Sequence, residues 1–267
     1  MLKIFVLIAL FAFHLNAESW GRINVDIEGG FSAVLSNQYQ SGKTGTLFNF
    51  SKEGKEDFLF PNWRAAVGLN IHKRHDVEFT YQPIFLDTVA NAQQDLSFDN
   101  FKIDKGLTFQ ARYYFPFYRA SYFYHLIEKP SMYWSLGLGL QMRSVNITFL
   151  NQSKNTAFVQ TNIGPVPLIT TRFRYDFENK LFLGFDAAGW WSAIPIANGS
   201  VKETTGWIYD VGLRGGICAR DFLDVYVSMR LIGGGAKGDG SMRESGESYT
   251  YNTLNVLNFT TGFVFKI

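Results

Sequence analysis

The stretch that decides the fold is Met132-Tyr-Trp-Ser-Leu-Gly-Leu-Gly-Leu-Gln-Met-Arg143. Its even-numbered residues are all large and apolar, whereas its odd-numbered residues from Ser135 onward are small, polar or charged. Side chains along a β-strand switch faces with this period of two residues. We therefore predict a long strand here, with one apolar face and one face of small and polar side chains.

The same alternation recurs along the rest of the chain, which also has 25 glycines and 17% aromatic residues. Glycines favour turns, and aromatic residues favour strands. The pattern predicts an all-β fold of about ten strands, with eight or twelve also compatible. The other alternating segments are 23–28, 63–70, 77–82, 107–124, 169–176, 181–186, 207–217, 223–231 and 257–267.

One of these segments changes parity along its length. From Leu107 to Phe115 the odd residues are apolar, whereas beyond Pro116 the apolar residues are Ala120, Tyr122 and Tyr124. Since proline cannot donate a hydrogen bond to a ladder, we expect a one-residue bulge near Pro116 that restores the alternation.

The connections between the expected strands alternate in length. Short links fall at 73–76, 126–130, 178–180 and 219–222, and long polar links at 36–57, 89–105, 151–160, 192–204 and 237–248. This order places every long loop on one side and both termini on the other. Short inner turns and long outer loops are typical of bacterial outer-membrane barrels, so we predict a single antiparallel transmembrane β-barrel. A secreted or periplasmic all-β domain is the alternative.

The N-terminus reads as an export signal. Lys3 precedes an unbroken apolar run from Ile4 to Phe13, and Leu15-Asn16-Ala17 forms a small-residue cleavage site. Ten apolar residues are too few for a spanning helix, which needs about 20. We predict a signal peptide over residues 1–17 and a barrel over residues 18–267, since no later apolar run is long enough for a helix.

Composition excludes several other classes. The formal net charge of +2 provides no general attraction to nucleic acid. The single cysteine, Cys218, excludes an intramolecular disulfide and a multi-cysteine zinc site.

The closing segment Asn255-Val-Leu-Asn-Phe-Thr-Thr-Gly-Phe-Val-Phe-Lys-Ile267 resembles the C-terminal assembly signal of bacterial outer-membrane β-barrel proteins, although that signal usually ends on an aromatic residue. Together with the layout of residues 18–267, it makes the chain similar to a porin-like outer-membrane family of unassigned function. The resemblance implies an outer-membrane location, contact with membrane lipid and lipopolysaccharide, and insertion by the barrel-assembly machinery.

Catalytic residues are not evident in the sequence. The ten-strand layout resembles the omptin proteases, which carry acidic pairs and an Asp-His pair at the outer rim, but His72, His75 and His125 fall at expected inner turns. The same absence of an outer histidine argues against outer-membrane phospholipases and lipid A deacylases, which use histidine as a general base. The loop acids lack EF-hand spacing. We predict no catalytic residue, cofactor or metal site, and therefore a non-enzymatic protein.

The parity opposite to the apolar face carries charges of both signs. Inside a narrow barrel such charges must be paired or wetted, so we predict a salt-bridged lumen that side chains largely fill. A narrow channel is the alternative, and an excess of three positive groups would make it weakly anion-preferring. We expect the outer loops 36–57 and 237–248 to bind any extracellular ligand. The predicted lumen residues are Arg22, Asp26, Glu28, Arg64, Glu78, Arg112, Arg143, Arg172, Arg174, Asp176, Asp186, Asp210, Arg214, Asp224 and Arg230, with Arg119 and Lys266.

Overall fold

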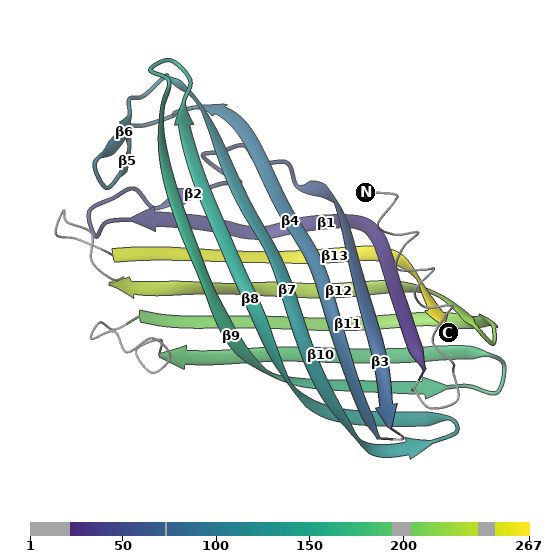
Figure 1. The fold of residues 1–267 in the computed structure, drawn as a ribbon. Helices are drawn as coiled ribbons and strands as arrows, with labels where there is room; N and C mark the ends of the chain where they lie inside the picture. Colours follow the sequence, from purple (N-terminus) through teal and green to yellow (C-terminus); the bar gives the residue numbers. More distant parts are fainter. Residues whose placement is uncertain (1–21, 73, 194–203, 240–248) are drawn as a thin grey trace.

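The computed structural model describes residues 22–72, 74–193, 204–239 and 249–267, which form a closed antiparallel barrel (Figure 1). Each long strand pairs with the next one along the chain, and β13 pairs with β1 to close the wall. The predicted all-β barrel of ten strands is confirmed. Its strands are β1 (Ile23–Ser41), β3 (Leu59–His72), β4 (His75–Asn91), β7 (Thr108–Lys129), β8 (Met132–Asn151), β9 (Thr156–Asp176), β10 (Leu181–Ala193), β11 (Thr204–Arg220), β12 (Leu223–Asp239) and β13 (Tyr249–Lys266).

Three short strands belong to the connections. β2 (Phe48–Asn49) pairs with Gln38 and Tyr39 of β1, and β5 (Leu96–Phe98) forms a hairpin with β6 (Phe101–Ile103). None of the described residues forms a helix of the length and apolarity needed to cross a membrane.

The two ends of the barrel differ. β3 and β4 end close together at one end, the turn end, where residues 130–131, 177–180 and 221–222 make short connections and Ile23 and Ile267 also pair. The opposite loop end carries residues 42–58 and 92–107. The expected loops 192–204 and 237–248 lie mostly outside the described residues, as does the expected signal peptide 1–17.

The expected long loop 151–160 is wrong, because β8 and β9 run on to a turn of residues 152–155. The Asn151 Oδ1 atom accepts the backbone N–H groups of Ser153 and Lys154, both at 3.1 Å. Asn155 then adopts a positive φ of 49°, which asparagine tolerates better than most residues. Local asparagine chemistry therefore closes a tight hairpin within a polar segment that reads as a loop.

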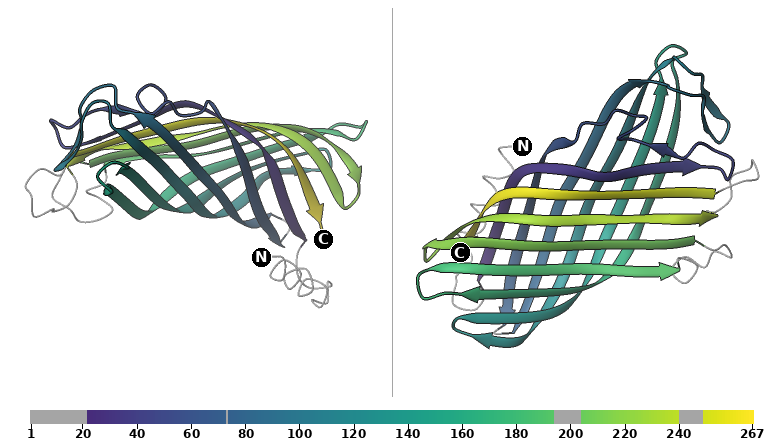
Figure 2. Two further views of the ribbon diagram at one scale, coloured as in Figure 1. Left: turned by 90° about the horizontal axis from the view of Figure 1, so that it is seen from above. Right: turned by 180° about the vertical axis from the view of Figure 1, so that it is seen from behind.

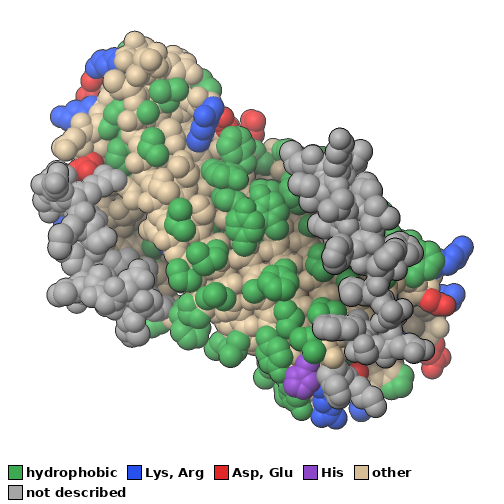
Figure 3. Space-filling view, viewed as in Figure 1, with side chains coloured by type: hydrophobic (Ala, Val, Ile, Leu, Met, Phe, Trp, Pro, Cys, Tyr) green, Lys and Arg blue, Asp and Glu red, His purple; other side chains and the backbone are tan. Residues whose placement is uncertain are grey.

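A belt of exposed apolar side chains surrounds the middle of the barrel, with charged side chains gathered toward the ends (Figure 3). Leu138 is 68% exposed, and Phe79 and Val227 are exposed to a similar degree. A closed barrel satisfies its backbone hydrogen bonds internally and can therefore place such a belt in lipid. The protein is accordingly built as a membrane-spanning barrel, with short turns at one end and longer connections at the other.

The expected bulge near Pro116 is wrong. The pairing of β7 with β8 keeps the same register from Tyr114–Asn146 to Phe117–Arg143, and odd residues face the lumen on both sides of Pro116. What changes is the lumen itself. Phe109, Ala111, Tyr113 and Phe115 face an apolar interior near the loop end, whereas residues beyond Phe117 face a polar one.

Toward the loop end the wall separates along two seams. β3 pairs with β4 only between Ala65 and His72, and β9 pairs with β10 only from Ile169 to Asp176. The outer parts of β4, β7, β8 and β9 therefore form one sheet, which crosses the sheet of β10 to β13 obliquely (Figures 1 and 2). Prolines, which interrupt ladders, occupy the strand segments along both seams. These are Pro61, Pro83, Pro165 and Pro167.

Candidate functional site: the lumen

Five arginines and five carboxylates form one ion-paired network across the middle of the lumen. Arg230 lies at its centre, with Nη1 2.6 Å from Asp210 Oδ1 and Nη2 2.6 Å from Asp186 Oδ2. Asp210 also accepts Arg119 Nη1 at 2.9 Å. Since unpaired buried charge is costly, this pairing is what permits ten charged groups in the interior. The members are Asp26, Glu28, Arg64, Glu78, Arg119, Arg172, Asp186, Asp210, Arg214 and Arg230.

The network connects strands that are far apart in the sequence. Arg172 on β9 donates from Nη2 to both oxygens of Glu78 on β4 at 2.8 Å, and Arg64 on β3 donates to Glu28 on β1 at 3.2 Å. Neutral side chains satisfy the remaining oxygen atoms, as where Thr260 of β13 donates to Glu28 at 2.7 Å. The network therefore braces the barrel from wall to wall.

At the turn end the lumen opens into a cavity of about 900 Å³. Its walls carry a second ion-paired group in which Arg174 Nη1 and Lys266 Nζ each lie 2.7 Å from Asp224. Arg174 also donates to Asp176 at 2.7 Å. His125 lies in the same cavity, with Nε2 2.7 Å from Asp76. This vestibule, as we call it, is charged but nearly balanced in sign.

Toward the loop end an apolar core replaces the charges. Phe98 of β5 stacks on Phe149 of β8 with ring centroids 3.9 Å apart, and Phe48 of β2 meets Phe149 edge-on at 5.0 Å. Both connecting segments are thus inserted between the two sheets. Residue Thr46 links them, since its backbone N–H donates to Ser97 O at 2.8 Å.

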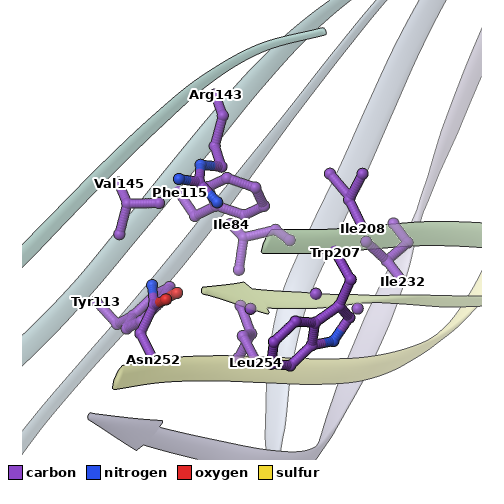
Figure 4. Close-up of a pocket in the computed structure, with 13 residues that line it drawn as sticks. Ile84, Tyr113, Phe115, Arg143, Val145, Trp207, Ile208, Ile232, Asn252 and Leu254 are labelled. Atoms are coloured by element: carbon purple, nitrogen blue, oxygen red, sulfur yellow. The ribbon is translucent and has the colours of Figure 1, made fainter. Parts of the chain in front are cut away.

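Between this core and the network lies a cavity of about 30 Å³ (Figure 4). Ile84, Phe115 and Val145 come from one sheet, and Ile208 and Ile232 from the other. Its polar side chains include Tyr113, Arg143 and Asn252.

The structure places the predicted lumen residues in several different settings. Arg22 is exposed at the mouth of the vestibule, and Arg143 lies in the small cavity apart from the network. Arg112 is on the outer surface, where its Nε donates to Asp87 at 3.1 Å, so its assignment to the lumen is wrong. Every other predicted position, including Arg119 and Lys266, belongs to the network or to the vestibule group.

These placements change the expected charge balance. The network contains five basic and five acidic groups, and the vestibule group contains two of each. The expected excess of three positive groups came from Arg22, Arg112 and Arg143, which lie elsewhere. The network and the vestibule group therefore carry no net charge.

Several residues that fill the lumen were missed in the sequence. Gln141 accepts Arg119 Nε and Nη2 at 3.0 and 2.7 Å, and Tyr226 donates to Asp26. Both sit at inward-facing positions of their strands, so the strand parity was the signal that could have found them. The aromatic residues of β2 and β5 carry no such signal, because short strands in loops have no periodicity to read.

The described histidines lie away from the loop end. His125 faces the vestibule, and His75 Nδ1 lies 2.6 Å from the hydroxyl of Tyr122 at the same end. Among the residues with described placement, no three metal-ligating side chains gather into a site.

Comparisons with known proteins support the fold. The structure is similar to the outer membrane protease OmpT from Escherichia coli, with a TM-score of 0.58 and 14% sequence identity over 94% of this chain and 99% of that one. Matches to a Pseudomonas aeruginosa FadL homologue (TM-score 0.39, 8% identity, 92% and 89% coverage) and to OprG from Pseudomonas aeruginosa (0.37, 13%, 91% and 95%) are much looser. No family model and no curated protein sequence matches the chain. The chain therefore has the architecture of bacterial outer-membrane β-barrel proteins.

Proposed function

We propose that this integral outer-membrane barrel is a non-enzymatic, non-conducting protein whose loop end acts as a surface for extracellular contacts. The observation that carries the proposal is the separation of the two lumen cavities. Arg119, Asp210 and Arg230 line neither the vestibule nor the small cavity, and they form the layer between them. Solutes that enter from the periplasmic side would meet a buried salt-bridge layer and then an aromatic core.

The loop end suits a contact surface because its connections are held in place. β2 and the β5–β6 hairpin are anchored by buried Phe48 and Phe98, while Lys52, Lys102 and Lys154 remain exposed. An anchored segment loses less conformational entropy on binding than a free loop does. We further propose that lipid and lipopolysaccharide surround the apolar belt, and that the barrel-assembly machinery acts on the closing strand β13.

Planar-bilayer recording tests the proposal. We expect purified mature protein that has passed a heat-modifiability check for the folded barrel to give no discrete conductance steps. The variant Arg172→Gln serves as the diagnostic, since it alters a charge that lines the vestibule. Discrete steps in the wild type that change in Arg172→Gln would establish the narrow channel instead.

The hydrolase alternative has its own test, because OmpT is a protease. We expect the folded protein to leave phospholipid and basic peptide substrates intact. Turnover that disappears when an acidic residue at the loop end, such as Asp87 or Asp104, is replaced by asparagine would overturn the non-enzymatic assignment.

A further inference from the structure

Arg143 differs from the other arginines of the lumen. The six that belong to the network or the vestibule group each lie within ion-pair distance of at least one carboxylate. Arg143 has no carboxylate partner within the described part of the chain, and its buried Nε atom has no hydrogen-bond partner there. It nevertheless projects from β8 into the interior, beside Phe115 (Figure 4).

The surroundings of Arg143 are mostly hydrocarbon. Ile84, Val145, Ile208, Ile232 and Leu254 line the same cavity, so the guanidinium lies mainly beside apolar side chains. Arg143 is partly buried, and a cation in such a setting is costly unless an anion or a polar group compensates it. No other lumen arginine in the described residues has this combination of an apolar cavity and a missing partner.

A second donor lines the cavity on the same sheet as Arg143, because Tyr113 lies on β7 next to β8, and Asn252 of β13 lines it from the other sheet. Asn252 Oδ1 accepts the backbone N–H of Ala236 at 2.9 Å, and its side chain and that of Tyr113 line the same cavity (Figure 4). The Tyr113 hydroxyl is thus a donor available at the cavity that Arg143 lines. An O–H donor and a guanidinium together form an anion-binding arrangement.

The size of the cavity limits the occupant. A volume of about 30 Å³ accommodates one or two atoms of water size, and not an oxyanion with an attached chain. Beside the cavity, Gly234 lets β12 lie close to β11, because a Cβ atom at Gly234 would lie 2.6 Å from Trp207 O. We propose that Arg143 and Tyr113 bind a single halide ion, chloride under natural conditions, between the two sheets of the loop end.

Thermal unfolding of the mature protein in detergent tests this site. The protein is unfolded once in sodium gluconate and once in sodium chloride of equal ionic strength. With chloride at a hundredfold excess over its dissociation constant, halide binding should raise the unfolding midpoint by about 5 °C. Arg143→Met should abolish the response, and in gluconate it should unfold at a higher temperature than the wild type because the unpaired charge is gone. Arg112→Gln, which removes an exposed arginine on the outer surface, should keep the wild-type response.

Crystals of the wild type grown in bromide provide a direct readout that does not depend on the folding of any variant. We expect an anomalous peak within hydrogen-bond distance of the Arg143 guanidinium. An equal chloride response in Arg143→Met, no bromide peak at Arg143, or stabilisation by acetate and not by halides would each overturn the proposal.

Discussion

Glu56 provides a titratable contact that holds the first loop-end segment against the barrel. Glu56 lies in the connection between β2 and β3, where its Oε1 accepts Asn37 Nδ2 of β1 at 2.9 Å and its Oε2 has no hydrogen-bond partner among the described residues. Burial raises the pKa of Glu56 to about 7 from its ordinary 4.5. The hydrogen bond from Asn37 opposes the rise, and the neighbouring Asp57 adds to it.

The sign and size of the effect follow from linkage. The packed segment holds its proton more tightly than the released segment does, so packing is strongest below pH 4.5 and weakens as the pH rises to about 7. Above that pH the contribution is fully lost. The whole shift corresponds to about 3 kcal/mol, of which about 2 kcal/mol falls between pH 5.5 and 8.

Hydrogen exchange of residues 42–58 measures this directly. After correction for intrinsic rates, we expect opening of the segment to be about thirtyfold more frequent at pH 8 than at pH 5.5. Glu56→Gln should remove the pH dependence. Glu53→Gln is the matched control, because it removes a carboxylate from the same segment yet retains an acceptor for the N–H of Asn49. Equal exchange at both pH values in the wild type, or an unchanged dependence in Glu56→Gln, would refute the reasoning.

Three further outcomes are expected. Asp210→Ala should destabilise the barrel by about 3–5 kcal/mol, because it leaves buried arginines unpaired. Asp87→Asn on the outer surface should change the stability by about 1 kcal/mol or less. The unfolding midpoints of the two variants in detergent test this difference. Phe98→Ala should lower the free energy of opening the β5–β6 hairpin by about 3–5 kcal/mol, because the stack on Phe149 is lost. Faster hydrogen exchange confined to residues 96–103 would show this loss. An epitope inserted between residues 153 and 154 should be labelled on intact cells, and failure to label would reverse the topology.

Strand periodicity was sufficient to predict the barrel, because a membrane barrel must alternate along every strand. The Met132–Arg143 pattern predicted which face of β8 is inside, and the same reasoning found most of the salt-bridged lumen. The two failures of parity have a common cause. Near the loop end the interior is apolar and the exterior mixes polar with apolar side chains, so Arg112 and Phe115 lie on the faces opposite to those that a membrane pattern implies.

Other features depend on contacts between distant residues and cannot be read from a local pattern. The partners of Arg230 come from β10 and β11 as well as β1, and the missing partner of Arg143 becomes evident only when both sheets are in place. The tight turn after Asn151 depended on one side chain accepting two backbone N–H groups. Residues 152–155 are otherwise as polar as a long loop.

The two seams divide the protein into two parts whose apolar side chains face in opposite directions. Below them the protein is a membrane barrel with lipid outside and charge inside, whereas above them two crossed sheets enclose Phe48, Phe98 and Phe149 as in a water-soluble sandwich. The hydrophobic effect of water stabilises the upper half but does not act in the same way within lipid. Urea should therefore melt the sandwich while the barrel beneath it stays closed, so that unfolding of this protein proceeds in two separate transitions rather than one.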